Sequence, residues 1–246
     1  MGVFKSEIEQ EYDEKRKKRR AVNLSHAEKG VVFFDLDMAH VEEGVVIGAG
    51  TYIGPAVVIT GDTEIGDDCV IGQNCRIENS RIGGGCHVDQ SVVTNSEVGE
   101  NTAVGPFAYM RPGSFVGARC KIGDFVEIKN SVIGDDTKIS HLSYIGDADL
   151  GTNINVGCGV VFVNYDGREK HRSTVGDGAF IGCNVNIISP VTIESGSYVA
   201  AGSTVSRRVP SGALLVARPS AQVREGWVEK RGLLKDRLEK LEGKDS

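Results

Sequence analysis

The chain has 246 residues, of which 25% are charged, and its formal net charge at pH 7 is −6. An acidic balance of this size gives no reason to expect nucleic acid as a partner. No apolar run approaches the ~20 residues that a membrane-spanning helix needs, and no secretory signal pattern opens the chain. We therefore expect a cytoplasmic protein without a membrane segment.

The first thirty residues are interpreted as a charged arm that precedes the main domain. Residues 5–20 are rich in charged side chains and contain neither Gly nor Pro, which favours an exposed helix. The basic run from Lys15 to Arg20 is more typical of a solvated helical face than of an electrostatic contact site.

A branched aliphatic residue returns at almost every sixth position between Val41 and Val205, and Gly follows many members of the series. A period of six fits neither a helix nor a long alternating strand, but it is the repeat of a parallel β-helix. Most proteins of this class are acyltransferases, and they resemble one another in being left-handed. We therefore predict an all-β fold with a left-handed parallel β-helix over residues 31–209, roughly nine coils at about 4.8 Å spacing.

A second inward position, filled by small residues, is expected four places after each aliphatic residue. There the chain supplies Thr51, Val57, Cys69, Cys75, Ser114, Cys120, Val126, Val132, Thr137, Ser143, Ala179 and Val185. Cys86 has the same place, so four of the six cysteines are interpreted as buried fillers, not as disulfide or metal partners. Cys158 and Cys183 lie two places after an aliphatic residue, outside this set.

Polar residues that the core does not need lie along one predicted face, because every third hexad shares a face. The aliphatic column is Met110, Ile128, Ile145 and Phe162, and beside it lie Arg111, Lys129, Tyr144, Asn164 and Tyr165. Arg111 and Lys129 are then about 4.8 Å apart on adjacent coils. Stacked cations repel each other unless they are solvated or share an anion, for which phosphate is the obvious candidate. A solvated pair of surface charges is the alternative.

The next column contains Ile139 and Val156, with His141, Asn155 and Cys158 beside it. His141 therefore lies round one corner from Lys129 and Tyr144. A single histidine is more often structural than catalytic, but a neutral imidazole is what removing a proton from an attacking ammonium requires.

The period breaks strongly once, between Phe162 and Val175, where thirteen residues replace one hexad. The extra residues predict a loop extruded from a corner of the prism, and loops held by a rigid scaffold often carry function.

Residues 210–246 are predicted to form an extended segment and a helix after Pro210 stops the repeat. Leu234, Leu238 and Leu241 share one helical face. This stripe could pack on the prism or against a helix of a neighbouring subunit, and the sequence does not choose between them.

Several longer strings are more specific than the hexapeptides. They are GPFA at 105–108, RPG at 111–113, FVEIK at 125–129, HLSYIGDA at 141–148, NINVG at 153–157, NYDG at 164–167 and AAGSTV at 200–205. In these strings the chain resembles the acetyltransferase domain of the bacterial bifunctional N-acetylglucosamine-1-phosphate uridyltransferase/glucosamine-1-phosphate acetyltransferase. The weaker repeat at 41–104 resembles the first coils of that domain, and the charged arm resembles the helix before them.

The resemblance implies that the chain acetylates the 2-amino group of glucosamine-1-phosphate, a step of cell-wall precursor biosynthesis, with His141 as general base. It implies that the sugar phosphate is held by Arg111, Lys129, Tyr144, Asn155 and Lys170, of which Arg111, Lys129 and Lys170 face the phosphate. It implies that acetyl-CoA, as co-substrate, contacts Asn164, Tyr165, Cys183, Ala201 and Arg218. No metal is implied for acetyl transfer. The family is trimeric with active sites between prisms, which implies a homotrimer.

Two departures from the family pattern bear on these expectations. No Gly-rich nucleotide-binding loop precedes residue 30, so we expect this chain not to make the UDP-sugar, and the Mg²⁺ used by that half is not implied. Cys183 stands where the family commonly has Ser, which puts a side-chain role in question while a backbone contact with the cofactor can survive.

Three competing hypotheses remain at this point. The acceptor could be another amino sugar or a nucleotide-linked sugar. A γ-class carbonic anhydrase has the same kind of prism, but it needs three converging histidines, and the spacing of His26, His40, His87, His141 and His171 does not supply them. A non-catalytic subunit could keep the fold, although its core would require none of the polar residues named above.

Overall fold

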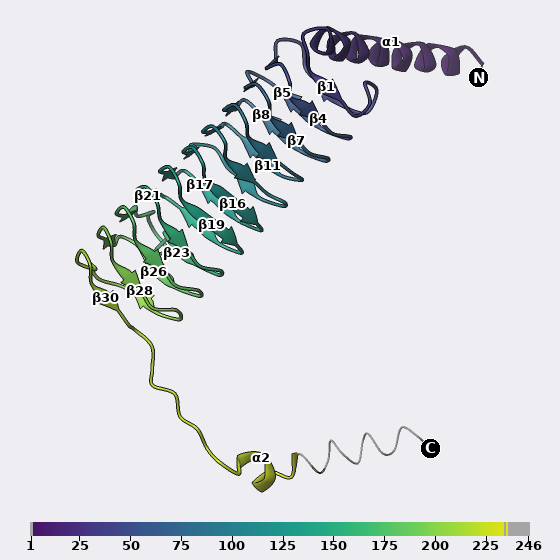
Figure 1. The fold of residues 1–246 in the computed structure, drawn as a ribbon. Helices are drawn as coiled ribbons and strands as arrows, with labels where there is room; N and C mark the ends of the chain where they lie inside the picture. Colours follow the sequence, from purple (N-terminus) through teal and green to yellow (C-terminus); the bar gives the residue numbers. More distant parts are fainter. Residues whose placement is uncertain (1, 234, 236–246) are drawn as a thin grey trace.

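The computed structural model describes residues 2–233 and residue 235, and it confirms the parallel β-helix predicted from the six-residue period. Short strands stack into three parallel sheets, which we call A, B and C, and successive strands of the chain pass from one sheet to the next (Figure 1). The three sheets form the sides of a long prism, and each coil contributes one strand to each side.

Within each sheet, neighbouring strands are three strands apart in the chain, except that β30 follows β28 in sheet A. Sheet A contains β1 (Val32–Phe33), β4 (Tyr52–Ile53), β7 (Val70–Ile71), β10 (His87–Val88), β13 (Ala103–Val104), β16 (Lys121–Asp124), β19 (Lys138–His141), β22 (Asn155–Val156), β25 (Phe180–Ile181), β28 (Tyr198–Val199) and β30 (Leu214–Leu215). Sheet B contains β2 (His40–Val41), β5 (Val58–Thr60), β8 (Arg76–Glu78), β11 (Val92–Thr94), β14 (Tyr109–Met110), β17 (Glu127–Lys129), β20 (Tyr144–Gly146), β23 (Val161–Val163), β26 (Asn186–Ile188) and β29 (Thr204–Val205). Sheet C contains β3 (Val46–Ile47), β6 (Glu64–Ile65), β9 (Arg81–Ile82), β12 (Ser96–Val98), β15 (Ser114–Val116), β18 (Val132–Ile133), β21 (Ala148–Leu150), β24 (Ser173–Val175) and β27 (Thr192–Ile193).

The core is a stack of aliphatic side chains inside the prism. Met110, Ile128 and Ile145 are in register on sheet B, as the period predicted, and all three are fully buried. Burying a side chain of this size contributes about 1.5–3 kcal/mol, so the repeated row stabilises every coil. Parallel pairing continues beyond residue 209, because β30 pairs with β28.

The small inward position is also filled as predicted, with one exception. Eleven of the twelve residues expected there are buried, including Cys69, Cys75 and Cys120, and Cys86 is buried with them. The prediction for Val132 is wrong, since its side chain is exposed and Ser131 is buried in its place. The reason is a five-residue spacing between Ile128 and Ile133, which shortens the turn by one residue. The inward position therefore falls three residues after Ile128 instead of four.

Backbone turns at the prism corners require Gly where the next coil approaches closely. A Cβ added at Gly66 would lie 2.5 Å from the backbone N of Gly84, whereas one added at Gly84 would lie 3.4 Å from its nearest neighbour, the carbonyl oxygen of Asp67. We expect Gly66→Ala to lower the free energy of unfolding by about 1–3 kcal/mol, because backbone must move. The matched variant Gly84→Ala should change it by less than about 0.5 kcal/mol. Urea denaturation measures both, and equal effects would contradict the expectation.

Helix α1 (Gly2–Ala27) projects from one end of the prism and covers its first coil (Figure 1). The buried amide of Asn23 donates to the carbonyl oxygens of Leu36 and Ala39, at 2.8 and 3.0 Å, and Arg20 pairs with Asp37. Most of the remaining helix surface is exposed, in agreement with its charged sequence.

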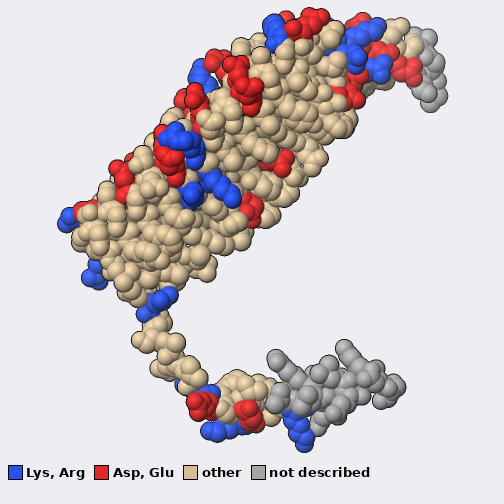
Figure 2. Space-filling view, in the orientation of Figure 1, with Lys and Arg blue, Asp and Glu red and all other residues tan. Residues whose placement is uncertain are grey.

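At the other end, extended chain follows β30 and leads to the short helix α2 (Trp227–Lys230). The predicted leucine stripe of Leu234, Leu238 and Leu241 lies outside the described residues. Within residues 2–233 and 235, no helix is both long and apolar enough to cross a membrane. Acidic and basic side chains gather along one edge of the prism, and the broad face beside that edge carries few charges (Figure 2).

Candidate functional site

Three predicted cations converge at the edge of sheet B. Lys129 ends β17, Arg111 follows β14 one coil earlier, and their neighbours Ile128 and Met110 are in register. Lys170 comes from the extruded loop, and the adjacent ammonium of Lys129 lowers its pKa below the ordinary lysine value, with Arg111 adding to the effect. Like charges are therefore held close together, which is the arrangement of an anion-binding site.

Asp147 is the buried acceptor that organises this edge. Its carboxylate accepts hydrogen bonds from Lys129 Nζ at 3.3 Å, Asn130 Nδ2 at 2.6 Å and Asn164 Nδ2 at 2.5 Å. Burial acts to raise the pKa of Asp147, but these hydrogen bonds outweigh burial and hold the pKa below its ordinary value. A carboxylate that stays ionised here fixes the Lys129 side chain and joins it to the start of the loop.

The extruded loop lies between β23 and β24 and is braced from within. Its arms meet in an antiparallel bridge between Tyr165 and Lys170. Asp166 accepts hydrogen bonds from the backbone N of Glu169 and from the ring of His171, at 2.8 and 2.7 Å, and these contacts lower the pKa of Asp166. The loop therefore presents Lys170 from a defined turn.

Arg172 anchors the end of the loop to the prism. Its guanidinium donates to the Asp149 carboxylate, with Nε 2.6 Å from Oδ2, and to the backbone oxygen of Asn130 at 2.8 Å. Asn130 also binds Asp147, so the loop and the carboxylate beneath it share one network.

His141 is the last residue of β19, on sheet A next to the corner with sheet B. Its Nδ1 lies 2.5 Å from Oδ1 of Asp124, the last residue of β16. This hydrogen bond lowers the pKa of Asp124 below its ordinary value. Sequence reasoning missed Asp124, although the two residues end paired strands and are seventeen positions apart, which is one coil.

Tyr144 and Asn164 lie on the same side of the prism as Lys129. Tyr144 begins β20, directly beside Glu127 of β17, and its hydroxyl is 3.4 Å from the Asn164 side-chain nitrogen. Glu127 also holds Arg111, with Nη1 and Oε1 2.8 Å apart. The polar residues of the predicted sheet B column thus form one connected surface.

Asn155 lies apart from this surface within one chain. It begins β22 on sheet A, where it pairs with Lys138 and Phe180. The structure therefore does not bring Asn155 to Lys129 and Lys170 in a single chain.

The residues implied for acetyl-CoA form two groups. Cys183 and Ala201 occupy the same edge of sheet A as His141, on later coils, and Arg218 Nη1 donates to the Ala201 carbonyl oxygen at 2.6 Å. Cys183 is exposed, and the amide of Gly202 donates to its carbonyl oxygen at 2.8 Å. Asn164 and Tyr165 belong instead to the loop at the edge of sheet B.

All six cysteines are unpaired thiols, and burial raises the pKa of Cys75 to about 11. Over the part of the chain that the structure describes, no group of three or more His, Cys, Asp or Glu side chains could hold a metal ion.

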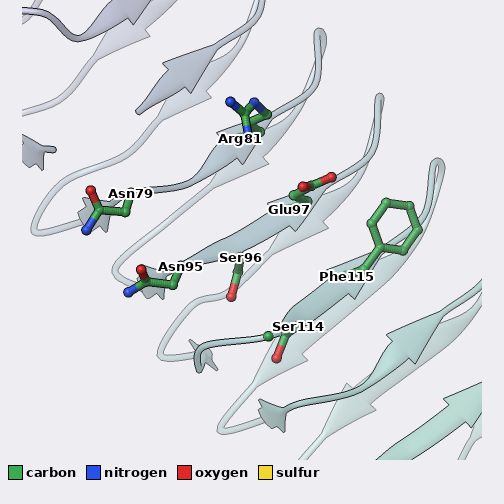
Figure 3. Close-up of a pocket in the computed structure, with 8 residues that line it drawn as sticks. Asn79, Arg81, Asn95, Ser96, Glu97, Ser114 and Phe115 are labelled. Carbon is green, nitrogen blue, oxygen red and sulfur yellow. The ribbon is translucent and has the colours of Figure 1, made fainter. Parts of the chain in front are cut away.

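A separate hollow lies on the outer face of sheet C (Figure 3). It is lined by Asn79, Arg81, Asn95, Ser96, Glu97, Gly113, Ser114 and Phe115. None of the predicted site residues lines it, and the ionic side chains within it carry opposite charges. The surface around Lys129 is therefore the better candidate, because cations gather there around a defined position.

Comparison with known proteins agrees with the repeat fold. The family model described as bacterial transferase hexapeptide (six repeats) matches residues 44–79 and 172–207. The bifunctional protein GlmU of Clostridioides difficile (strain 630) is 53% identical over 213 residues, which cover 87% of this chain and 46% of that protein. The bifunctional protein GlmU of Alkaliphilus metalliredigens is 46% identical over 215 residues, 87% of this chain and 47% of that protein. The chain thus spans about half the length of these curated relatives.

Solved structures with the same fold include two UDP-N-acetylglucosamine acyltransferases. The Francisella novicida protein aligns with a TM-score of 0.55 at 18% identity, covering 82% of this chain and 74% of that chain. The Bacteroides fragilis protein aligns with a TM-score of 0.52 at 17% identity, covering 79% and 75%. At this identity the likeness establishes the fold alone.

Proposed function

This chain belongs with the hexapeptide-repeat transferases and corresponds to the acetyltransferase half of the bifunctional GlmU proteins, and from this premise we propose that it acetylates glucosamine-1-phosphate. Acetyl-CoA donates the acetyl group, and the 2-amino group of the sugar accepts it. The observation that carries the proposal is the convergence of Lys129, Lys170 and Arg111 around a braced loop. A phosphate placed there would relieve the repulsion between the cations.

The sugar phosphate is held by charge and oriented by hydrogen bonds. The ammonium groups of Lys129 and Lys170 and the guanidinium of Arg111 bind the phosphate oxygens. Tyr144 lies beside them and sets the direction in which the sugar ring extends, while Asn164, which contacts the Tyr144 hydroxyl and Asp147, faces acetyl-CoA. Fixing both reactants in one complex removes much of the entropic cost of a bimolecular reaction.

The acyl transfer is a direct attack. The amine lone pair attacks the thioester carbonyl, His141 accepts the proton from the nitrogen, and the coenzyme A thiolate leaves as the tetrahedral intermediate collapses. Cys183, Ala201 and Arg218 line the edge of sheet A above His141 and contact the cofactor. No acyl-enzyme on a cysteine is needed.

The complete site lies between the prisms of a homotrimer. Asn155 is on sheet A, while the cations are on sheet B, so a second prism is required to bring both faces to one sugar. The extruded loop then covers the groove between neighbours.

The experiment that tests this proposal is an acetyl-transfer assay with a panel of acceptors. Acetyl-CoA consumption is followed with glucosamine-1-phosphate, glucosamine-6-phosphate, glucosamine and a UDP-linked amino sugar, and mass spectrometry identifies the product. The highest kcat/KM is expected with glucosamine-1-phosphate. A higher kcat/KM with another acceptor would identify that acceptor as the substrate instead. No transfer to any of the four acceptors would favour a non-catalytic subunit.

The phosphate contact is expected to weaken with rising pH. Because Lys129 lowers the pKa of Lys170, this ammonium loses its proton at a lower pH than an ordinary lysine. Below that range the site keeps its full positive charge, and above it one charge is lost, so the KM for the phosphorylated sugar should rise. The variant Lys170→Arg stays charged throughout and should flatten the rise. KM is measured from about pH 7 to 10 for both proteins, and parallel curves would contradict the assignment.

A further inference from the structure

The contact between His141 and Asp124 is set by the pairing of strands β16 and β19, and both residues belong to these strands. In the described part of the chain, β16 and β19 are the only strands with four residues, and all the others have two or three. The extra length carries the parallel pairing to the register Asp124↔His141. The amide of Leu142 then donates to the Asp124 carbonyl oxygen at 2.9 Å, which ties the end of one strand to the next.

Each of the two strands is followed directly by a residue with left-handed backbone conformation. Phe125 has φ 55° and Leu142 has φ 47°, so the chain turns sharply directly after Asp124 and after His141. The two side chains are therefore the last that the ladder fixes before the corner. Their carboxylate and imidazole meet at 2.5 Å although both are partly exposed to solvent.

A carboxylate at Nδ1 determines which nitrogen of a neutral imidazole carries the hydrogen. An ionised carboxylate only accepts hydrogen bonds, so the ring must present Nδ1–H to Asp124. The lone pair is then on Nε2, at the far side of the ring. A histidine without such a partner has no corresponding constraint on its tautomer.

We propose that Asp124 is a positioning residue for His141, holding the imidazole in the Nδ1–H tautomer so that Nε2 faces the acceptor amine as the base. The catalytic consequence rests on the proposed acetyl transfer, whereas the tautomer does not. When Nε2 takes the proton, the carboxylate also stabilises the imidazolium that forms. Nothing in the sequence pattern singled out Asp124, because it has no counterpart among the quoted motifs and only the coil register places it.

The other charged and titratable groups around His141 do not take the place of this contact. Lys121 lies on β16 and lowers the pKa of Asp124 less strongly than His141 does, which keeps the carboxylate ionised. Lys138 lies at the opposite end of β19. Cys158, in the turn after β22, is the neighbour on the next coil, where the amide of Gly159 donates to the His141 carbonyl oxygen at 3.4 Å.

The test follows the tautomer directly by ¹⁵N NMR of the histidine side chains, assigned with His141→Gln. In the intact protein above the titration range, His141 should show a protonated Nδ1 and an unprotonated Nε2. Asp124→Ala should return the ring towards Nε2–H. The matched variant Asp136→Ala removes another exposed carboxylate, which pairs with Arg119 and does not contact His141, and it should leave the tautomer unchanged.

The same variants are then compared in kinetics. Asp124→Ala should lower kcat by about 10- to 100-fold and leave the KM for both substrates within about twofold. Asp124→Asn, whose amide oxygen can still accept from Nδ1, should recover part of kcat.

Each outcome bears on a different part of the proposal. An Nε2–H tautomer in the intact protein, or no change of tautomer in a folded Asp124→Ala, would overturn the positioning role. A changed tautomer with unchanged kcat would overturn its part in catalysis. If the intact protein transfers no acetyl group, the proposed function fails, while the NMR measurement still supports or overturns the tautomer assignment. Thermal melts of all variants identify any that do not fold.

Discussion

Replacing His141 with alanine is expected to lower kcat by about 10²- to 10⁴-fold, which is the usual contribution of a positioned general base. The attacking amine must lose a proton as its bond to the acetyl carbon forms, and His141 is the imidazole at the edge where the implied cofactor residues lie. Affinity for acetyl-CoA should remain largely intact, because Cys183, Ala201 and Arg218, the residues proposed to contact it, lie on other coils. Steady-state kinetics and calorimetric titration with coenzyme A measure the two quantities.

The control for this variant is His40→Ala. His40 begins β2 on sheet B near the N-terminal end of the prism, and it is exposed, so its removal should leave kcat unchanged. Near-normal turnover in His141→Ala would remove the residue from the mechanism. Loss of acetyl-CoA affinity together with turnover would instead indicate that the imidazole has a structural role at the cofactor edge.

Replacing Lys129 with alanine is expected to raise the KM for glucosamine-1-phosphate by about 10- to 100-fold, the loss that follows when one charge-assisted hydrogen bond is removed. The Lys129 side chain is only 17% exposed and is held by Asp147, so its position is defined before the substrate arrives. The KM for acetyl-CoA should stay within about twofold. Initial rates with each substrate varied in turn give both constants.

Removing Lys129 also takes one donor from buried Asp147, so stability must be measured alongside kinetics. Asp147 keeps its hydrogen bonds from Asn130 and Asn164, and we expect the variant to remain folded. Lys17→Ala, on the exposed face of α1, is the matched loss of one positive charge and should alter neither KM. An unchanged KM for the sugar phosphate in a folded Lys129→Ala would contradict the phosphate assignment.

The fold was predictable because the prism repeats one local rule. Each coil needs a buried aliphatic residue at a fixed spacing, so Ile122, Ile128 and Ile139 identify their sheets from the sequence alone, and the strand register agrees. The prediction failed at Val132, because one missing residue in a turn shifts the small inward position while leaving the aliphatic series in place. A spacing of five between aliphatic residues is the signal that would have corrected it.

The candidate site was predictable where it follows the same register. Arg111 and Lys129 are one coil apart in the sequence, and they are neighbours in the structure. The carboxylates that hold the site were not found in this way, since the chain has many acidic residues and the period does not distinguish Asp124 and Asp147 from the others. Only their contacts with His141 and Lys129 distinguish them from solvated surface charges.

The sequence by itself determined the parallel β-helix, the face on which Arg111 and Lys129 lie and the neighbouring face that carries Asn155, because these depend on spacing along the chain. The tertiary structure decided how the loop folds back to place Lys170 against Lys129. The reason is physical: a loop outside the repeat has no register, so its course is set by hydrogen bonds such as those of Asp166 and Arg172. Those contacts join residues whose spacing obeys no period.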